Sequence, residues 1–134
     1  MIRAAVAAVA VVLVVAGWAG YVRYWRHGDP RPLAFRDESA KLRGFKTPHP
    51  LARVFRARNA DETSVLIASG PRSSSAYRLQ VQGVVEERGR VVVRVRELTP
   101  TLAHPGRAVL TYPYRLLVLP RRDKHITVKW EGRP

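Results

Sequence analysis

The sequence contains no cysteine among its 134 residues. This absence excludes disulfide bonds, thiolate metal ligands, a cysteine nucleophile and a lipid anchor on an N-terminal cysteine. Acidic residues are also few, with ten Asp and Glu against 24 Lys and Arg and a net charge of +14. Such an excess is typical of chains that meet nucleic acid or anionic membranes, but 20 of the cations are Arg, so coding bias explains it equally well. The length suits one globular domain behind a targeting segment.

Charge is missing altogether from residues 4–22, "AAVAAVAVVLVVAGWAGYV". Nineteen residues make about 28 Å of helix, close to the thickness of a bilayer core. Aromatic residues and then Arg follow at the C-terminal end, as at a membrane interface. The sequence therefore predicts a membrane anchor over residues 1–25 that contacts the lipid bilayer through residues 4–22.

For this segment the sequence leaves alternatives open on two questions, whether it is cleaved and which way it is oriented. A cleaved signal peptide is the other interpretation, although the apolar run is longer than the usual h-region. A count of flanking positive charges favours a cytoplasmic C-terminal part, whereas the family resemblance described below favours an extracytoplasmic one. We adopt a single-pass protein of the cytoplasmic membrane with its C-terminal domain outside.

Long helical patterns are absent after residue 50, where the sequence alternates with period two instead. Residues 26–50 are charged and contain four prolines, which predicts a basic tether. Residues 63–70 and 77–85 fit strands, and in the second of these Tyr77, Leu79, Val81, Gly83 and Val85 form the expected buried face.

Glycine at position 89 predicts a turn that returns the chain through Val91, Val93 and Val95, and a last strand alternates through Trp130. Residues 51–134 are thus expected to form one all-β domain of about six strands. The predicted fold is a small antiparallel β-sandwich or partly open barrel, preceded by one N-terminal transmembrane helix.

No constellation of catalytic or metal-binding residues stands out. A Ser/His/Asp site built from Ser74, His104 and Asp123 lacks the context of a nucleophile elbow. No His or carboxylate pair has the spacing of metal ligands on one strand face, and no glycine-rich loop precedes a helix. We therefore expect no enzyme activity, no metal and no cofactor.

A nucleic-acid interface is a further alternative. Several arginines of the central hairpin follow one another at short spacing, and Arg94 and Arg96 share a face. That face lacks the aromatic platform of single-strand binders, and charged residues on strands commonly guard sheet edges. We expect nucleic acid to be an unlikely partner.

Three stretches, "VLIASGPRSSSAY", "YRLQVQGVVEERGRVVVRVRELTP" and "LTYPYRLLVLP", together resemble the C-terminal domain of the PrcB family. The resemblance implies a non-catalytic, extracytoplasmic β-domain that binds or stabilises another protein, such as a surface peptidase. A chagasin-like protease inhibitor is the alternative. Where the family has Thr-Gly-Gly-Tyr, this chain has Ser74, Ser75, Ala76 and Tyr77, so two freely flexible positions carry a Cβ.

Loops at one end of a rigid β scaffold are the usual binding surface of such domains. Pro113 interrupts an aliphatic stretch, which predicts an edge strand or a bulge, with Tyr112 and Tyr114 capping the core and their hydroxyls in solvent. The predicted partner-binding residues are Pro71, Arg72, Ser73, Ser74, Ser75, Tyr77, Thr99, Pro100, His104, Tyr112 and Tyr114.

Overall fold

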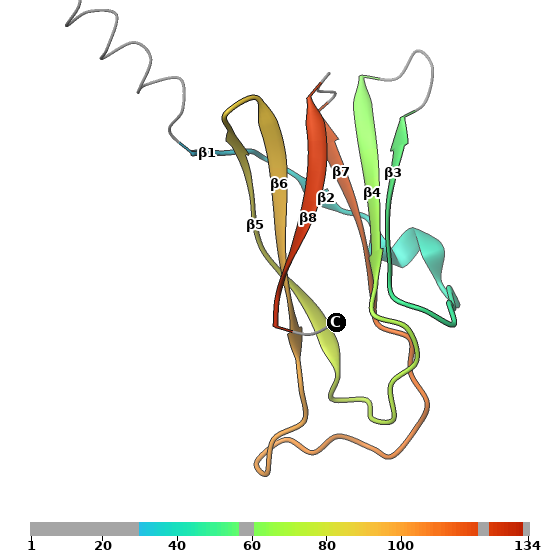
Figure 1. The fold of residues 1–134 in the computed structure, drawn as a ribbon. Coiled ribbons are helices and arrows are strands. Elements are labelled where there is room, and N and C mark those ends of the chain that lie inside the picture. The colour runs from blue at the N-terminus through green and yellow to red at the C-terminus, as the bar shows by residue number, and fades with distance from the viewer. Residues whose placement is uncertain (1–29, 57–60, 121–123, 133–134) are drawn as a thin grey trace, which may run out of the picture.

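The computed structural model describes residues 30–56, 61–120 and 124–132 as a β-sandwich of two four-stranded sheets (Figure 1). The first sheet has the strand order β1-β5-β6-β8, and the second has the order β2-β7-β4-β3. The strands are β1 Arg31–Pro32, β2 Arg36–Asp37, β3 Leu51–Arg56, β4 Glu62–Ala68, β5 Arg78–Glu87, β6 Arg90–Leu98, β7 Tyr114–Pro120 and β8 His125–Glu131. The all-β prediction is confirmed, and of the two predicted architectures the structure has the sandwich.

The core lies between the two sheets and is built from alternate residues of the long strands. These residues are aliphatic and buried because each strand turns every second side chain toward the facing sheet. The central members are Val65, Ile67, Leu79, Val84, Val91, Val93, Val95, Leu117, Leu119 and Ile126. The predicted inward face of residues 91–95 is therefore confirmed.

A two-residue turn joins β5 to β6, as the sequence predicts. Arg88 and Gly89 both have positive φ, at 43° and 78°, which matches the twist of the hairpin strands. The predicted alternation in β5 is correct only as far as Val81. A bulge lies between Val81 and Gly83, so the phase shifts by one residue and Val84 enters the core in place of Gly83 and Val85.

One strand pair departs from the antiparallel prediction. β8 pairs with β6 in parallel, whereas the other pairs of named strands are antiparallel. After β6 the chain crosses to the second sheet and runs back as β7, so that β8 returns to the first sheet in the same direction as β6 (Figure 1). The direction follows from this double crossing, which no local pattern encodes.

Part of the expected tether belongs to the sandwich. Arg31 and Pro32 pair with β5, and Arg36 and Asp37 pair with β7. A 3-10 helix, η1 Ser39–Leu42, follows, and the Ser39 hydroxyl accepts a hydrogen bond from the Leu116 amide at 3.0 Å. Strands of two residues carry no periodicity, so the sequence pattern does not reveal them.

The predicted membrane-spanning segment, residues 4–22, lies outside the described residues. Within the part of the chain that the structure describes, no helix has the length and apolar character needed to cross a membrane.

Candidate interaction surface

Two loops lie together at the end of the sandwich opposite the β5–β6 turn (Figure 1). Residues 69–77 connect β4 to β5, and residues 99–113 connect β6 to β7. Arg72 and Thr111 form an antiparallel bridge, with both N–H···O distances at 2.8 Å. We call these two segments the paired loops. They act as one unit because the bridge continues strand-like pairing beyond the sheet.

The serine run in residues 73–75 crosslinks the paired loops. The Ser74 hydroxyl donates to the Pro105 carbonyl at 2.8 Å and accepts from the Ala76 amide at 3.1 Å. Ser75 exchanges two bonds with Arg107: its amide donates to the Arg107 carbonyl at 3.0 Å, and its hydroxyl accepts from the Arg107 amide at 2.8 Å. These serines therefore satisfy loop backbone groups that secondary structure leaves unpaired.

Ser74 has a structural role in this arrangement. Its proton is directed to a backbone carbonyl, and no hydrogen bond joins it to His104 among the described residues. The backbone of His104 instead closes a turn with Thr101, whose amide donates to the His104 carbonyl at 3.2 Å. Asp123, the third residue of the alternative catalytic site, lies outside the described residues.

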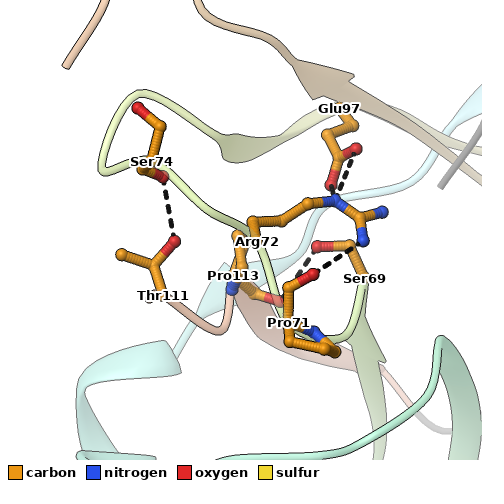
Figure 2. Close-up of polar contacts among 7 residues, drawn as sticks. All are labelled: Ser69, Pro71, Arg72, Ser74, Glu97, Thr111 and Pro113. Atoms are coloured by element: carbon orange, nitrogen blue, oxygen red, sulfur yellow. Dashed lines mark hydrogen bonds and ion pairs between the residues drawn. The ribbon is translucent and has the colours of Figure 1, made fainter. Parts of the chain in front are cut away.

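Arg72 anchors the paired loops to β6. Its Nε lies 3.0 and 3.1 Å from the two carboxylate oxygens of Glu97, and its Nη1 donates to the Pro71 carbonyl at 3.0 Å (Figure 2). The guanidinium also lies over the ring of Tyr77, 5.8 Å from its centroid. The Glu97 side chain is only 5% exposed and that of Arg72 19%. Arg72 thus places a positive charge against a nearly buried carboxylate.

Gly106 marks the closest approach between the two segments. A Cβ on Gly106 would lie 2.6 Å from both the Ala76 amide nitrogen and the Ser74 hydroxyl oxygen, and Gly106 has a φ of +70°. Only glycine satisfies both conditions. By contrast, the two positions where the family motif has glycine need no such freedom here, because Arg88 is the one non-glycine residue with positive φ in the described part of the chain.

Pro113 lies neither on an edge strand nor at a bulge of the β4–β7 pair, the two positions that the sequence predicts. It immediately precedes β7, which lies between β2 and β4. The Pro113 carbonyl accepts the Ser69 amide at 3.1 Å, and the Ser69 hydroxyl also approaches it (Figure 2). Proline is tolerated because the strand uses its carbonyl and has no need of an N–H at this entry position.

The two flanking tyrosines contact the segment around η1. The Tyr114 hydroxyl donates to the Ser39 carbonyl at 2.9 Å, so it is not left to solvent as predicted. The Tyr114 ring packs edge-on against Phe45, with centroids 5.5 Å apart, and Lys46 Nζ lies 5.7 Å from the centroid of Tyr112. Both tyrosines therefore contact the N-terminal part of the domain, Tyr114 from the start of β7 and Tyr112 from the residues just before it.

The predicted site residues consequently fall into two groups. Pro71, Arg72 and the three serines lie on one loop, and Thr99, Pro100 and His104 lie on the other. Tyr112 and Tyr114 line a separate open hollow of about 300 Å³, which Tyr77 also borders. Tyr77 thus stands between the two groups.

The sequence prediction named no aliphatic residue of the longer loop. Leu102 is fully exposed, and Leu110 and Val109 are 65% and 46% exposed. Large apolar side chains in solvent on a hydrogen-bonded loop are a common feature of protein interfaces. The available signal was the apolar composition of residues 101–111, which follows neither strand nor helix periodicity.

Metal ligands do not gather in this region. Over residues 30–56, 61–120 and 124–132, no three His, Asp or Glu side chains form a group that could hold a metal ion.

Comparison with protein families bears on the part of the chain that holds both loops. The family model described as PrcB C-terminal matches residues 63–120. This stretch matches the PrcB C-terminal family. The match runs from the second residue of β4 to the last residue of β7, so the PrcB C-terminal region includes both members of the paired loops but not β3 or β8. The resemblance inferred from the three sequence stretches is thereby confirmed. Searches of curated proteins and of solved structures returned no match.

Proposed function

We propose that this protein is a membrane-anchored, non-catalytic interaction module whose paired loops bind another protein outside the cytoplasmic membrane. The partner we propose is a peptidase or another envelope protein. The observation that carries the proposal is a pair of loops, fixed by hydrogen bonds to each other and by an ion pair to β6, that holds Leu102 and Leu110 in solvent.

Rigidity is the first support for this proposal. A loop that is already ordered loses little conformational entropy when it binds, so its apolar contacts contribute more fully to affinity. Ser74, Ser75 and Thr111 provide this order, because each joins one loop to the other by a side-chain hydrogen bond. The exposed leucines then provide apolar area for a partner to bury.

The position of the loops is the second support. The chain enters the described fold at Arg31, which pairs with Glu86 beside the β5–β6 turn. The paired loops lie at the other end of the strands (Figure 1). An anchor over residues 4–22 would thus precede the end of the sandwich that is remote from the loops, and would leave them accessible to a partner.

A photo-crosslinking residue placed in the full-length chain tests the proposal in native membranes. We expect a crosslinker at Leu102 or Leu110 to capture one dominant envelope protein or peptidase, identified by mass spectrometry, and a crosslinker at Arg88 to capture none. Equal capture from Arg88, or no adduct from either leucine, would contradict the proposal. Protease digestion of intact cells tests the location, since full protection of the domain would place it inside.

A captured peptidase would also distinguish stabilisation from inhibition. The peptidase is assayed with and without the full-length chain in uncharged detergent. Unchanged or prolonged activity supports a stabilising module, whereas loss of activity would support the chagasin-like inhibitor.

A further inference from the structure

β3 is an open edge of the second sheet. The strand order β2-β7-β4-β3 places it last, and in the part of the chain that the structure describes it pairs with β4 alone. Figure 1 shows it at the outside of the sandwich, beyond β4. Sheet edges that are very short, bulged or interrupted by proline resist the addition of another strand. β3 has six residues in continuous register with β4 and contains no proline, so it lacks these protections.

The register of the second sheet shows which backbone groups of β3 are free. The Ser69 amide donates to the Pro113 carbonyl, so every second residue of β4 counted back from Ser69 directs its backbone groups toward β7. The residues between them bond to β3, where their partners are Leu51, Arg53 and Phe55. The N–H and C=O groups of Ala52 and Val54 consequently point away from β4. Both residues are exposed, so these groups are accessible to a ligand.

Two apolar side chains lie exposed along this edge. Val54 is 37% exposed and Phe55 is 48% exposed. Val54 pairs with the core residue Val65 and is therefore turned toward the inner face of the sheet, whereas Phe55 is turned toward the outer face. The other long edge strand, β8, has no large apolar side chain exposed to this extent. An added strand could thus bury apolar area on both faces at β3.

The two arginines of β3 carry positive charge that no carboxylate balances. Over residues 30–56, 61–120 and 124–132, neither Arg53 nor Arg56 forms an ion pair, and Arg56 Nη2 donates instead to the Lys124 carbonyl at 3.0 Å. A second copy of this chain would bring the same two arginines to the interface. Charge complementarity therefore favours an acidic partner over self-association.

We propose that β3 binds an extended acidic segment of another protein, which pairs with the backbone of Ala52 and Val54 as an added strand of the second sheet. Carboxylates opposite Arg53 and Arg56 would balance the two charges, and apolar side chains would lie opposite Val54 and Phe55. The recognised pattern is therefore acidic-apolar-apolar-acidic, and it reads the same in either strand direction. This contact is separate from the paired loops, and β3 lies outside the residues that the family model matches.

Two labelled peptides of identical composition test the pattern. Both are about ten residues long with threonine flanks, and the central residues are Glu-Val-Val-Glu in one and Val-Glu-Glu-Val in the other. Binding to the full-length chain in uncharged detergent is measured by fluorescence anisotropy. We expect the first peptide to bind roughly tenfold more tightly, because its carboxylates can lie opposite both arginines. Equal binding would overturn the proposal, since net charge alone would then explain it.

Val54→Pro tests the backbone pairing. It removes an amide hydrogen that points outward and leaves the bonds between β3 and β4 in place, so we expect a folded protein that no longer binds the peptide. Val54→Thr keeps the amide and the β-branched shape and is the matched control. Circular dichroism and melting temperature report whether each variant is folded. Equal binding by the two variants would overturn the proposal.

A peptide with N-methyl groups on both valines makes the same test without altering the protein. Adjacent amides of an extended chain point to opposite edges, so one of the two methyl groups must face β3 whichever way the peptide runs. We expect this peptide to lose binding. Unchanged affinity would overturn the proposal even if the proline variant did not fold.

Charge reversal and sedimentation identify the occupant. Arg53→Glu should weaken binding of the Glu-Val-Val-Glu peptide roughly tenfold, whereas Arg43→Glu, at another exposed position, should change it much less. Equal weakening would overturn the proposal. A dimer of the full-length chain that Val54→Pro dissociates, without peptide binding, would also overturn it, because the occupant would then be a second copy. Crosslinking from Leu102 and Leu110 tests the paired loops separately from all of these measurements.

Discussion

Arg72 and Glu97 form an ion pair that joins the shorter of the paired loops to β6, with Nε close to both carboxylate oxygens (Figure 2). Glu97 is the less exposed partner, and Arg72 offsets part of the cost of burying its side chain. The pair also holds Arg72 over the ring of Tyr77. A single contact between residues 25 positions apart thus orients the segment proposed to meet a partner.

Replacing Arg72 alone should be far more damaging than replacing both partners. Arg72→Met leaves the Glu97 carboxylate nearly buried without its counter-charge, and we expect a loss of roughly 2–3 kcal/mol in the free energy of unfolding. The double variant Arg72→Met/Glu97→Met should recover most of this loss, because apolar side chains replace a pair whose desolvation is costly. Chemical denaturation of the four proteins in the cycle measures the effect. Equal instability of the single and double variants would show that the ion pair is not the cause.

Gly106→Ala should disrupt the paired loops. The added Cβ meets Ala76 and Ser74 at 2.6 Å in addition to the strain of a positive φ. Gly44→Ala is the matched control, because Gly44 has a φ of +80° and open space around it. We expect about 1–2 kcal/mol of destabilisation at Gly44 and clearly more at Gly106, together with faster amide exchange of Ser75 and Arg107. Similar losses of stability at both glycines would contradict the close approach of Gly106 to the shorter loop.

Tyr114→Phe removes the hydrogen bond from the tyrosine hydroxyl to the Ser39 carbonyl. The expected loss is about 1 kcal/mol, since the ring and its contact with Phe45 remain. Tyr112→Phe serves as the control, because the Tyr112 contact with Lys46 involves the ring face. Thermal unfolding compares the two variants, and a larger effect at Tyr112 would contradict the assigned roles.

Acid should weaken the attachment of β2 to the second sheet. The hydrogen bond from Arg36 at 2.6 Å, and the positive charge that comes with it, lower the pKa of Glu62 from its ordinary value of 4.5. Because the folded-state pKa is depressed, this pair stabilises the fold fully above pH 4.5, and the contribution is lost as pH falls through the lower folded-state pKa.

Melting temperatures of the wild type and Glu62→Gln, measured from neutral pH downward, test whether acid removes the stabilisation by this pair. The wild type should be the more stable at neutral pH, and the difference should shrink in acid. High salt should also reduce it, because both side chains are exposed and the pair is screened. A difference that grows in acid would exclude the assigned pair.

Local patterns in the sequence predicted a substantial part of the fold. The alternation through Val91, Val93 and Val95 identified the buried face of β6, and Gly89 identified the turn before it, because period two and positive φ are both properties of a few adjacent residues. The family resemblance likewise rested on short stretches in a fixed order. Residues 4–22, whose apolar character predicts a membrane anchor, are outside what the structure describes.

Other features depended on contacts between distant segments. The bulge after Val81, the parallel direction of β8 and the entry of β1 and β2 into the two sheets all result from how strands pair across the molecule. The grouping of the candidate site residues also depends on contacts between distant segments. Sequence reasoning grouped Tyr112 and Tyr114 with the loop residues, but their rings face the segment around η1.

The sequence by itself determined that the chain after residue 50 is all-β, which of its long strands have one buried face, and which family its loops resemble. Only the tertiary structure decided that the serines hold two loops together, that Arg72 pairs with Glu97, and that β3 is left as an open edge. The physical reason is that periodicity and turn preference act between neighbours in the chain. The partner of a hydroxyl, a carboxylate or a guanidinium depends on the register of strands that lie far apart in sequence.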